Sequence, residues 1–160
     1  MQLLSVEEQQ HLDDLLKYLR PYYRDHIAVY SRPFDGVTEL LESLKARNKK
    51  LAIATNKPSY FTVPLIETLQ LTYYFDVIHS GDTVTQKKPD PEMAESIITI
   101  MNEKKQDVLF VGDSETDFKT AVNAGIDIAL FTKGFEYPDV LTRLSSTFFF
   151  DDYHSLINTL

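Results

Sequence analysis

From Gly36 onward, short apolar segments alternate with stretches that have helical hydrophobic spacing. The apolar segments are LAIAT (51–55), FDVIHS (75–80), DVLFVGD (107–113), IDIALF (126–131) and TFFF (147–150). They are apolar throughout instead of at every second residue, which is typical of strands buried on both faces. Strands that alternate with helices build βα units and a parallel sheet. The sequence therefore predicts an α/β fold in which helices cover both faces of a parallel sheet.

Amphipathic segments separate these runs. They cover Val37–Leu44, Phe61–Leu69, Pro91–Met101, Ser114–Ala124 and 152–158. Before residue 31 the pattern differs, because two helices follow each other without a strand. Ser5 and Glu8 form a capping box, leucines follow at helical spacing, and Pro21 is predicted to end this first helix. A second short helix is expected over residues 22–30.

Composition narrows the class of protein. The chain has 160 residues, 43% of them hydrophobic, which is enough for one domain with its own core. It contains no cysteine, so disulfides and thiolate metal sites are excluded. The net charge of −8, without clusters of Lys or Arg, argues against binding to nucleic acid. No apolar run reaches the roughly 18 residues of a membrane helix, so no membrane partner is expected and a cytoplasmic location is predicted.

Polar side chains follow three of the predicted strands. Thr55 and Asn56 come after the first, Lys88 follows the second after a loop, and Asp113 and Asp117 follow the third. Ligands of open parallel sheets bind at the carboxyl ends of the strands, so these side chains are expected at one edge. A hydroxyl, an amide and an ammonium suit phosphoryl oxygens, whereas carboxylates suit magnesium. The pattern predicts a site for a small phosphorylated metabolite together with a hard cation.

Three segments in order resemble the second, third and fourth motifs of the haloacid dehalogenase superfamily. They are TNKP (55–58), KKPDP (87–91) and VGDSETDFKTAVNAGI (111–126). The likeness is greatest to the phosphoglycolate-phosphatase-like branch and runs from about Tyr22 to about Gly134. It implies a magnesium-dependent phosphatase with a Rossmann-like core and a helical cap inserted after the first strand.

The resemblance implies a role for each candidate residue. Thr55 and Asn56 would bind phosphate, and Lys88 would neutralise both the phosphate and the attacking carboxylate. Asp113 would be the metal ligand, and Asp117 would orient Lys88 or the water shell of the metal. Ordinary explanations also exist: polar residues often end strands, and a surface lysine pair is usually solvated. Asp117 also belongs to a capping-box pattern that starts at Ser114, and the capping role and the family role are compatible.

The stretch PFDGV (33–37) looks like the nucleophile motif of the same superfamily but is interpreted differently. An apolar strand does not precede it, because Tyr30–Pro33 cannot form a buried run. Asp35 is therefore predicted to be a turn residue at a helix start, where the cap returns to the core. Residues 1–32 are interpreted as the C-terminal part of a helical cap, and residues 33–160 as an α/β core that lacks its first strand.

The nucleophilic aspartate of the family's first motif has no counterpart in the sequence, so we expect this chain to be the C-terminal part of such an enzyme. The family would place the missing strand between LAIAT (51–55) and DVLFVGD (107–113). Each of these strands would then lose a neighbour on one edge. Exposed apolar edges invite pairing with other chains, so self-association through strand edges is predicted.

Three functions are compatible with this reasoning. The first is a phosphate monoester hydrolase whose nucleophile lies outside the chain, with phosphoglycolate as the nearest substrate guess. The second is a non-catalytic fragment or pseudoenzyme that binds phosphate and magnesium without turnover. The third is a phosphoacceptor domain of the response-regulator type. It is disfavoured because the acidic residues there come first and the lysine last, whereas this chain has the order Thr55, Lys88, Asp113.

Overall fold

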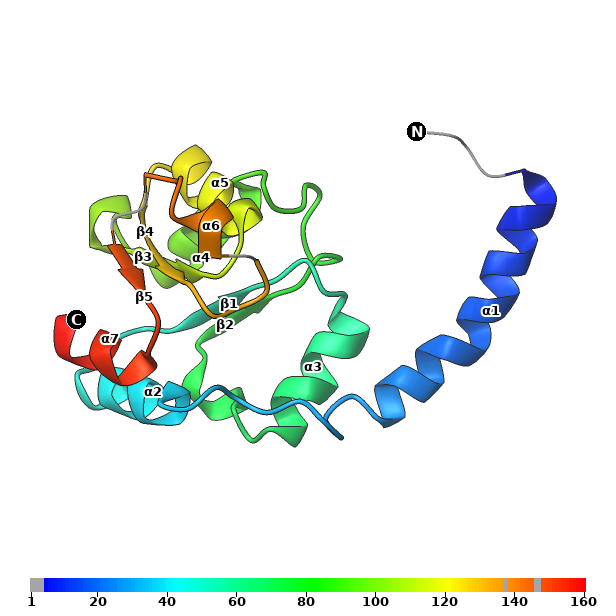
Figure 1. Cartoon of the computed structure of the whole chain (residues 1–160), viewed down its shortest axis with the longest axis horizontal. Helices are drawn as coiled ribbons and strands as arrows, with labels where there is room; N and C mark the ends of the chain where they lie inside the picture. The colour runs from blue at the N-terminus through cyan, green and yellow to red at the C-terminus, as the bar shows by residue number, and fades with distance from the viewer. Residues whose placement is uncertain (1–4, 137, 146–147) are drawn as a thin grey trace.

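Two separate parallel sheets form the centre of the computed structural model, which describes residues 5–136, 138–145 and 148–160 (Figure 1). In the first sheet, β1 (Ala52–Ala54) pairs with β2 (Val77–His79). In the second, β4 (Asp127–Phe131) lies between β3 (Leu109–Gly112) and β5 (Phe148–Phe150). All pairs are parallel, which confirms the predicted α/β class.

Helices cover both faces of the second sheet, as the packing of β4 shows. Ala129 and Phe131 pack against α2 (Val37–Ala46) and α7 (Tyr153–Thr159) in one apolar cluster. Ile128 and Leu130 pack against α5 (Glu115–Ala124) and α6 (Pro138–Leu141) in another. Because successive residues of a strand point to opposite faces, the apolar run of β4 is explained by burial on both sides.

The remaining elements complete the chain around the first sheet. These are α3 (Ser59–Thr68), the 3₁₀ turn Thr72–Tyr74, α4 (Glu92–Met101) and the 3₁₀ turn Lys105–Asp107. The helix α4 contacts β1 and β2 as well as α5, so it links the two sheets on one face. The short helix α6 was not predicted from the sequence. Of the predicted strand 147–150, Thr147 lies outside the described residues.

The two sheets are separated between β1 and β3. Among the described strands, β1 pairs with β2 alone and β3 with β4 alone, so each has one edge without a strand neighbour. A cavity of about 700 Å³ lies there, lined by residues of both strands and by the apolar sides of α2 and α4. Each of these two strands thus has the open edge that the sequence analysis expected, whereas the loss of a family strand from this gap stays a prediction.

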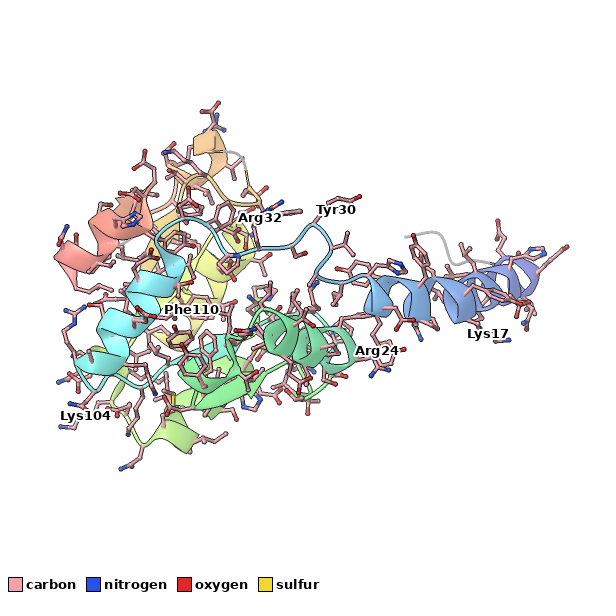
Figure 2. The ribbon with its side chains drawn as sticks, turned by 90° about the horizontal axis from the view of Figure 1, so that it is seen from below. Lys17, Arg24, Tyr30, Arg32, Lys104 and Phe110 are labelled. Carbon is pink, nitrogen blue, oxygen red and sulfur yellow. The ribbon has the colours of Figure 1, made fainter. Side chains whose placement is uncertain are left out.

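The prediction for the N-terminal segment was wrong at Pro21. A single helix, α1 (Val6–Asp25), runs through this proline instead of ending at it. A proline within a helix removes one backbone hydrogen bond, and an exposed helix can leave the freed carbonyl to water. The predicted capping box is present, with the Ser5 N–H donating to Glu8 over 2.8 Å. No described residue of α1 is buried, and Figures 1 and 2 show the helix projecting from the core, with Lys17 on the projecting part.

The PFDGV segment forms a turn that starts α2, as predicted. The N–H of Val37 donates to the carbonyl of Phe34 over 3.1 Å. The helix cap is Gly36 instead of Asp35, with a left-handed φ of 81°. A Cβ at Gly36 would lie 2.7 Å from Nδ1 of His154, so this turn packs directly against α7. This position therefore requires glycine for both backbone conformation and space.

No helix among the described residues is long and apolar enough to span a bilayer.

We predict that the chain self-associates through the open edges of β1 and β3. Val111 on β3 is 42% exposed although the strand is apolar. A charged residue on an edge blocks strand pairing, so Val111→Lys should shift the protein toward monomer. Sedimentation velocity over a range of concentrations measures this. The matched control is Val122→Lys on α5, which is 55% exposed and far from the edge in sequence. A wild-type chain that stays monomeric and melts cooperatively would contradict the prediction.

Candidate active site

The loop after β1 carries the first two predicted site residues. The Thr55 N–H donates to the carbonyl of His79 over 3.0 Å, which extends the pairing of β1 with β2 by one residue. The Thr55 hydroxyl accepts a hydrogen bond of 3.1 Å from the N–H of Lys57. This bond uses a lone pair of the hydroxyl oxygen, so the hydroxyl O–H of Thr55 can still donate to an anion.

Asn56 fixes the loop that carries Lys88. Its amide oxygen accepts from the Lys88 N–H over 2.9 Å, and its amide nitrogen donates to the Lys88 carbonyl over 2.9 Å. This double bridge ties the loop after β1 to the loop after β2. One amide N–H and lone pairs on the oxygen remain. The geometry thus gives Asn56 a positioning contact that the sequence did not reveal, beside its predicted contact with phosphate.

Lys88 points inward, whereas its neighbour Lys87 is exposed. The Lys88 ammonium binds the Asp117 carboxylate at 2.6 Å, and their side chains are 11% and 8% exposed. Burial of two charges is costly, and it is offset here by their attraction and by further hydrogen bonds to the carboxylate. Lys88 is also the lysine that the family resemblance selects for contact with phosphate, and that role stays a prediction.

Asp117 is held by three groups besides its own backbone. One oxygen accepts from Lys88, and the other accepts from the Ser114 hydroxyl at 2.8 Å and from the Asp113 N–H at 3.1 Å. The Asp117 N–H in turn donates to the Ser114 hydroxyl oxygen over 3.2 Å, which caps α5. Both the capping role and the contact with Lys88 are therefore present in one residue.

Asp113 lies next to this pair, directly after β3. Its Oδ2 accepts from the N–H of Phe135 at 2.9 Å. A Cβ at Gly134 would lie 2.3 Å from the same oxygen, so the loop after β4 can approach the carboxylate because residue 134 is glycine. Burial, with a smaller contribution from the negative charge of Asp113, raises the pKa of Tyr153 to about 12. Tyr153 of α7 is thus a neutral phenol near the site.

The donor set can be tested for magnesium. No group of three or more His, Asp or Glu side chains that could hold a metal occurs among residues 5–136, 138–145 and 148–160. Magnesium, however, typically takes one or two protein carboxylates and fills its shell with water and phosphate oxygens. Asp113 offers such a carboxylate, because one hydrogen bond to Oδ2 leaves lone pairs on both oxygens. Residues present here fit a magnesium ion held by a single protein carboxylate.

The predicted residues therefore gather at the carboxyl ends of β1, β2 and β3. Asn56, Lys88, Asp117 and Asp113 form a continuous set of contacts, and Thr55 lies one residue from Asn56. Sequence reasoning missed the glycines that allow this approach. A Cβ at Gly81 would lie 2.3 Å from the Asn56 carbonyl oxygen, and Gly134 has the same relation to Asp113. Their position in the loops that follow β2 and β4, within three residues of the strand ends, is the signal that could have found them.

An α/β fold with a lysine and carboxylates at the carboxyl ends of its strands is typical of proteins that bind phosphate groups. A family model described as haloacid dehalogenase-like hydrolase matches residues 1–131. The chain belongs to this family, and this decides against the response-regulator interpretation.

Several relatives resemble the chain over most of its length. It is 37% identical over 123 residues to a phosphoglycolate phosphatase of Thiobacillus denitrificans, covering 77% of this chain and 54% of the relative. It is 32% identical over 157 residues to a phosphoglycolate phosphatase of Salmonella typhi, covering 98% and 62%. This chain thus spans less than two thirds of the length of these curated relatives.

Solved structures agree with the fold. A protein of Haemophilus somnus described as a predicted phosphoglycolate phosphatase superposes with a TM-score of 0.84 at 26% identity, covering 98% of this chain and 68% of that one. A haloacid dehalogenase-superfamily hydrolase of Geobacter sulfurreducens superposes with a TM-score of 0.66 at 25% identity, covering 79% and 60%. These likenesses confirm the sequence-based resemblance to the phosphoglycolate-phosphatase-like branch.

We predict that Asp117→Asn destabilises the protein by about 3 kcal/mol, because it leaves the Lys88 ammonium buried without a counter-charge. The free energy of unfolding from urea titration measures this loss. The matched control is Glu95→Gln, which breaks an ion pair with Lys105 whose side chains are 47% and 50% exposed. Exposed pairs contribute less than about 1 kcal/mol. The double variant Lys88→Met/Asp117→Asn should recover part of the loss. Equal effects of Asp117→Asn and Glu95→Gln would refute the interpretation.

Proposed function

We propose that this chain carries the phosphate- and magnesium-binding part of a phosphate monoester hydrolase that acts on a small phosphorylated metabolite, with phosphoglycolate as the nearest substrate. The observation that carries the proposal is the buried Lys88–Asp117 pair, held between the Asn56 bridge and Asp113. Family membership and the phosphoglycolate phosphatases among the relatives support it.

In this proposal the phosphate binds at the carboxyl ends of β1 and β3. The Thr55 hydroxyl proton and the remaining Asn56 amide donor would bind phosphoryl oxygens, and Lys88 would offset their charge through its two remaining N–H donors. Asp117 acts on the substrate through Lys88, because it holds the ammonium in one orientation. Donors fixed before the substrate arrives stabilise developing charge without reorganising during the reaction.

Chemistry of this family type would proceed through an aspartyl-phosphate. An aspartate carboxylate oxygen attacks phosphorus in line, the P–O bond to the metabolite breaks, and the alkoxide leaves with a proton from a general acid. Water then attacks the phosphorus of the acyl phosphate and releases inorganic phosphate and the carboxylate. Magnesium, held by Asp113, would neutralise phosphoryl charge. We assign the attacking aspartate to a segment outside residues 1–160, because the family's first motif has no counterpart here.

The domain organisation forms part of the proposal. Residues 1–32 would belong to a helical cap and residues 33–160 to the core. The contacts of α1 with the core fit this division: Tyr23, which is 43% exposed, accepts a 3.0 Å hydrogen bond from Lys57 and packs edge-on against Phe61. Lys57 follows the proposed phosphate-binding residues, so the end of α1 adjoins the site.

A second function keeps the same site without turnover. The chain would then be a non-catalytic module that binds phosphate and magnesium. The observation that favours it is the lack of a counterpart to the nucleophile motif in the sequence, set beside an intact Lys88–Asp117 pair.

We predict that inorganic phosphate binds in the presence of magnesium and that Lys88→Met weakens this binding at least tenfold. A hydrogen bond to a charged group contributes roughly 1.5–3 kcal/mol, which corresponds to a tenfold or larger change in affinity. Isothermal titration calorimetry measures the affinity. Lys87→Met is the matched control, because it removes the same charge from the exposed neighbour and should change the affinity less than about twofold. Equal losses of phosphate affinity in both variants would contradict the prediction, because they would show that the net charge of the chain, and not a specific site at Lys88, attracts phosphate.

Turnover tests the assignment of the attacking aspartate to a segment outside residues 1–160. With 2-phosphoglycolate and magnesium, we expect the chain by itself to release phosphate no faster than the Asp113→Asn variant does. Release of phosphate is followed by a coupled colorimetric assay on folded protein. Turnover by the chain that Asp113→Asn abolishes would place the nucleophile within residues 1–160 and contradict our assignment.

A further inference from the structure

The helix α1 lacks the packing that stabilises most helices in proteins. None of its described residues is buried, and Figure 2 shows it extending away from the core, with Lys17 on the projecting part and Arg24 near the core. Isolated helices are only marginally stable in water, because most helical stability in proteins comes from packing of an apolar face. The interior Pro21 weakens this helix further. A partner on one face of α1 would supply the missing packing.

One face of α1 is apolar over most of its length. Residues three and four apart lie on the same face of a helix, and the large apolar side chains of α1 follow this spacing. These side chains, which we call the α1 stripe, are Leu12, Leu15, Leu16, Leu19, Tyr22 and Tyr23. Leu15 is 59% exposed, Leu19 50% and Tyr22 64%, so most of the stripe faces solvent.

A groove lies where the stripe meets α3. Its volume is about 520 Å³, and its lining includes Leu16, Lys17, Arg20 and, at the start of α3, Tyr60. Tyr60 is 42% exposed, so the apolar surface continues from the stripe onto the core. The Arg24 guanidinium lies 4.9 Å over the Tyr60 ring, next to the groove. A helix that packs on the stripe would therefore meet positive charge where it reaches the core.

The charges of α1 are divided between its two halves. Residues 6–15 contain no Lys or Arg, and their acidic side chains are Glu7, Glu8, Asp13 and Asp14. Residues 16–25 contain one acidic side chain, Asp25, and the cations Lys17, Arg20 and Arg24. Attraction to the helix dipole is confined to the first and last turns, so it does not account for the charges near the middle of α1.

Part of this charge has no partner within the chain. Lys17 pairs with Asp14 in the same helix at 2.8 Å. Asp13 and Arg20, in contrast, form no ion pair within the part of the chain that the structure describes. Charged groups of opposite sign are therefore available at the two ends of the stripe.

An antiparallel pair of α1 helices matches this division of charge. It places the acidic half of each helix beside the basic half of the other, whereas a parallel pair places like charges together. The stripe has its middle near Leu15 and Leu16, so a two-fold axis there also places leucine against leucine. The acidic first turn of one copy then reaches the groove beside Arg20 and Tyr60 of the other.

We propose that the α1 stripe is a homodimerisation surface. Its occupant is α1 of a second copy of this chain, packed antiparallel, so that each acidic half faces a basic half. This surface is separate from the open edges of β1 and β3. The proposal does not depend on the proposed function, because the residues of the phosphate site lie outside α1.

Sedimentation velocity over a range of concentrations tests the surface on the whole chain. The Val111→Lys background removes pairing through the strand edges, and we expect a monomer–dimer equilibrium in it. Leu15→Lys should weaken dimerisation at least tenfold, because it places a charge at the centre of the apolar contact. The matched control Gln10→Lys adds the same charge on the opposite face of α1 and should change dimerisation less than twofold.

Single cysteines establish the orientation, because the chain has no cysteine of its own. A disulfide requires Cα atoms within about 7 Å of each other. In the antiparallel dimer the two copies of residue 12 are about 10 Å apart along the axis, at 1.5 Å per residue, whereas residue 12 lies beside residue 19 of the other copy. A mixture of Leu12→Cys and isotopically labelled Leu19→Cys chains should therefore form mixed disulfides at least tenfold more often than self-links. Val122→Cys, exposed on α5, gives the background level.

Charge reversal tests the complementarity of the two halves. The double variant Asp13→Lys/Asp14→Lys makes both halves basic, and Lys17→Glu/Arg20→Glu makes both acidic. Each variant alone should dimerise at least tenfold more weakly than the parent chain, whereas a mixture of the two should form a mixed dimer. Equal dimerisation of each variant with itself and with the other would overturn the role of charge.

Three results would refute the homodimerisation surface. The first is a chain with an intact stripe that stays monomeric at high concentration in the Val111→Lys background. The second is a dimer that Leu15→Lys and Gln10→Lys weaken equally, because its contact would then lie elsewhere. The third is self-linking of Leu12→Cys in preference to the mixed disulfide, because it would show parallel helices.

Discussion

The buried ion pair between Lys88 and Asp117 connects the two halves of this fold at the edge where the candidate site lies. Lys88 belongs to the loop after β2 and Asp117 to the first turn of α5, which follows β3, so the pair joins elements of separate sheets. Asn56 lies in the loop after β1 and makes two hydrogen bonds to the Lys88 backbone, so β1 is also tied to this connection. A buried pair is costly to dehydrate, so its presence here is better explained by positioning than by net stabilisation.

The same connection explains how a split sheet can still hold an ordered site. On one face α4 spans the two sheets, and at the carboxyl edge the ion pair does so. Between these two links the backbone edges of β1 and β3 remain open and the interior contains a cavity. The site residues are therefore fixed by contacts on the loops, whereas the strands below them lack the continuous pairing that rigidifies most parallel sheets.

Much of the fold can be predicted from the sequence, because short apolar runs between amphipathic helices have few possible structures other than buried strands. The run that forms β4 is apolar at every position from Ile128 to Phe131, and the structure buries both faces of it. The positions of Lys88, Asp113 and Asp117 were predictable for a related reason: each follows a strand, and parallel strands bring their carboxyl ends together. The helix through Pro21 was not predictable, because a proline penalty of about 3 kcal/mol can be outweighed by neighbouring turns that continue the helix. The bridge from Asn56 to Lys88 joins residues far apart in sequence, and no local pattern encodes it.

The cavity between the two sheets lies close to the proposed phosphate site. Phe110 lines the cavity between β1 and β3, and its ring lies 5.7 Å from the Lys88 ammonium of the proposed phosphate site. Electrostatic interactions strengthen when water is excluded, and the Lys88 side chain is only 11% exposed, so it attracts an anion more strongly than an exposed lysine would. Stability and anion binding are therefore coupled through the Lys88–Asp117 pair, because the carboxylate that offsets the burial of the ammonium also fixes its orientation.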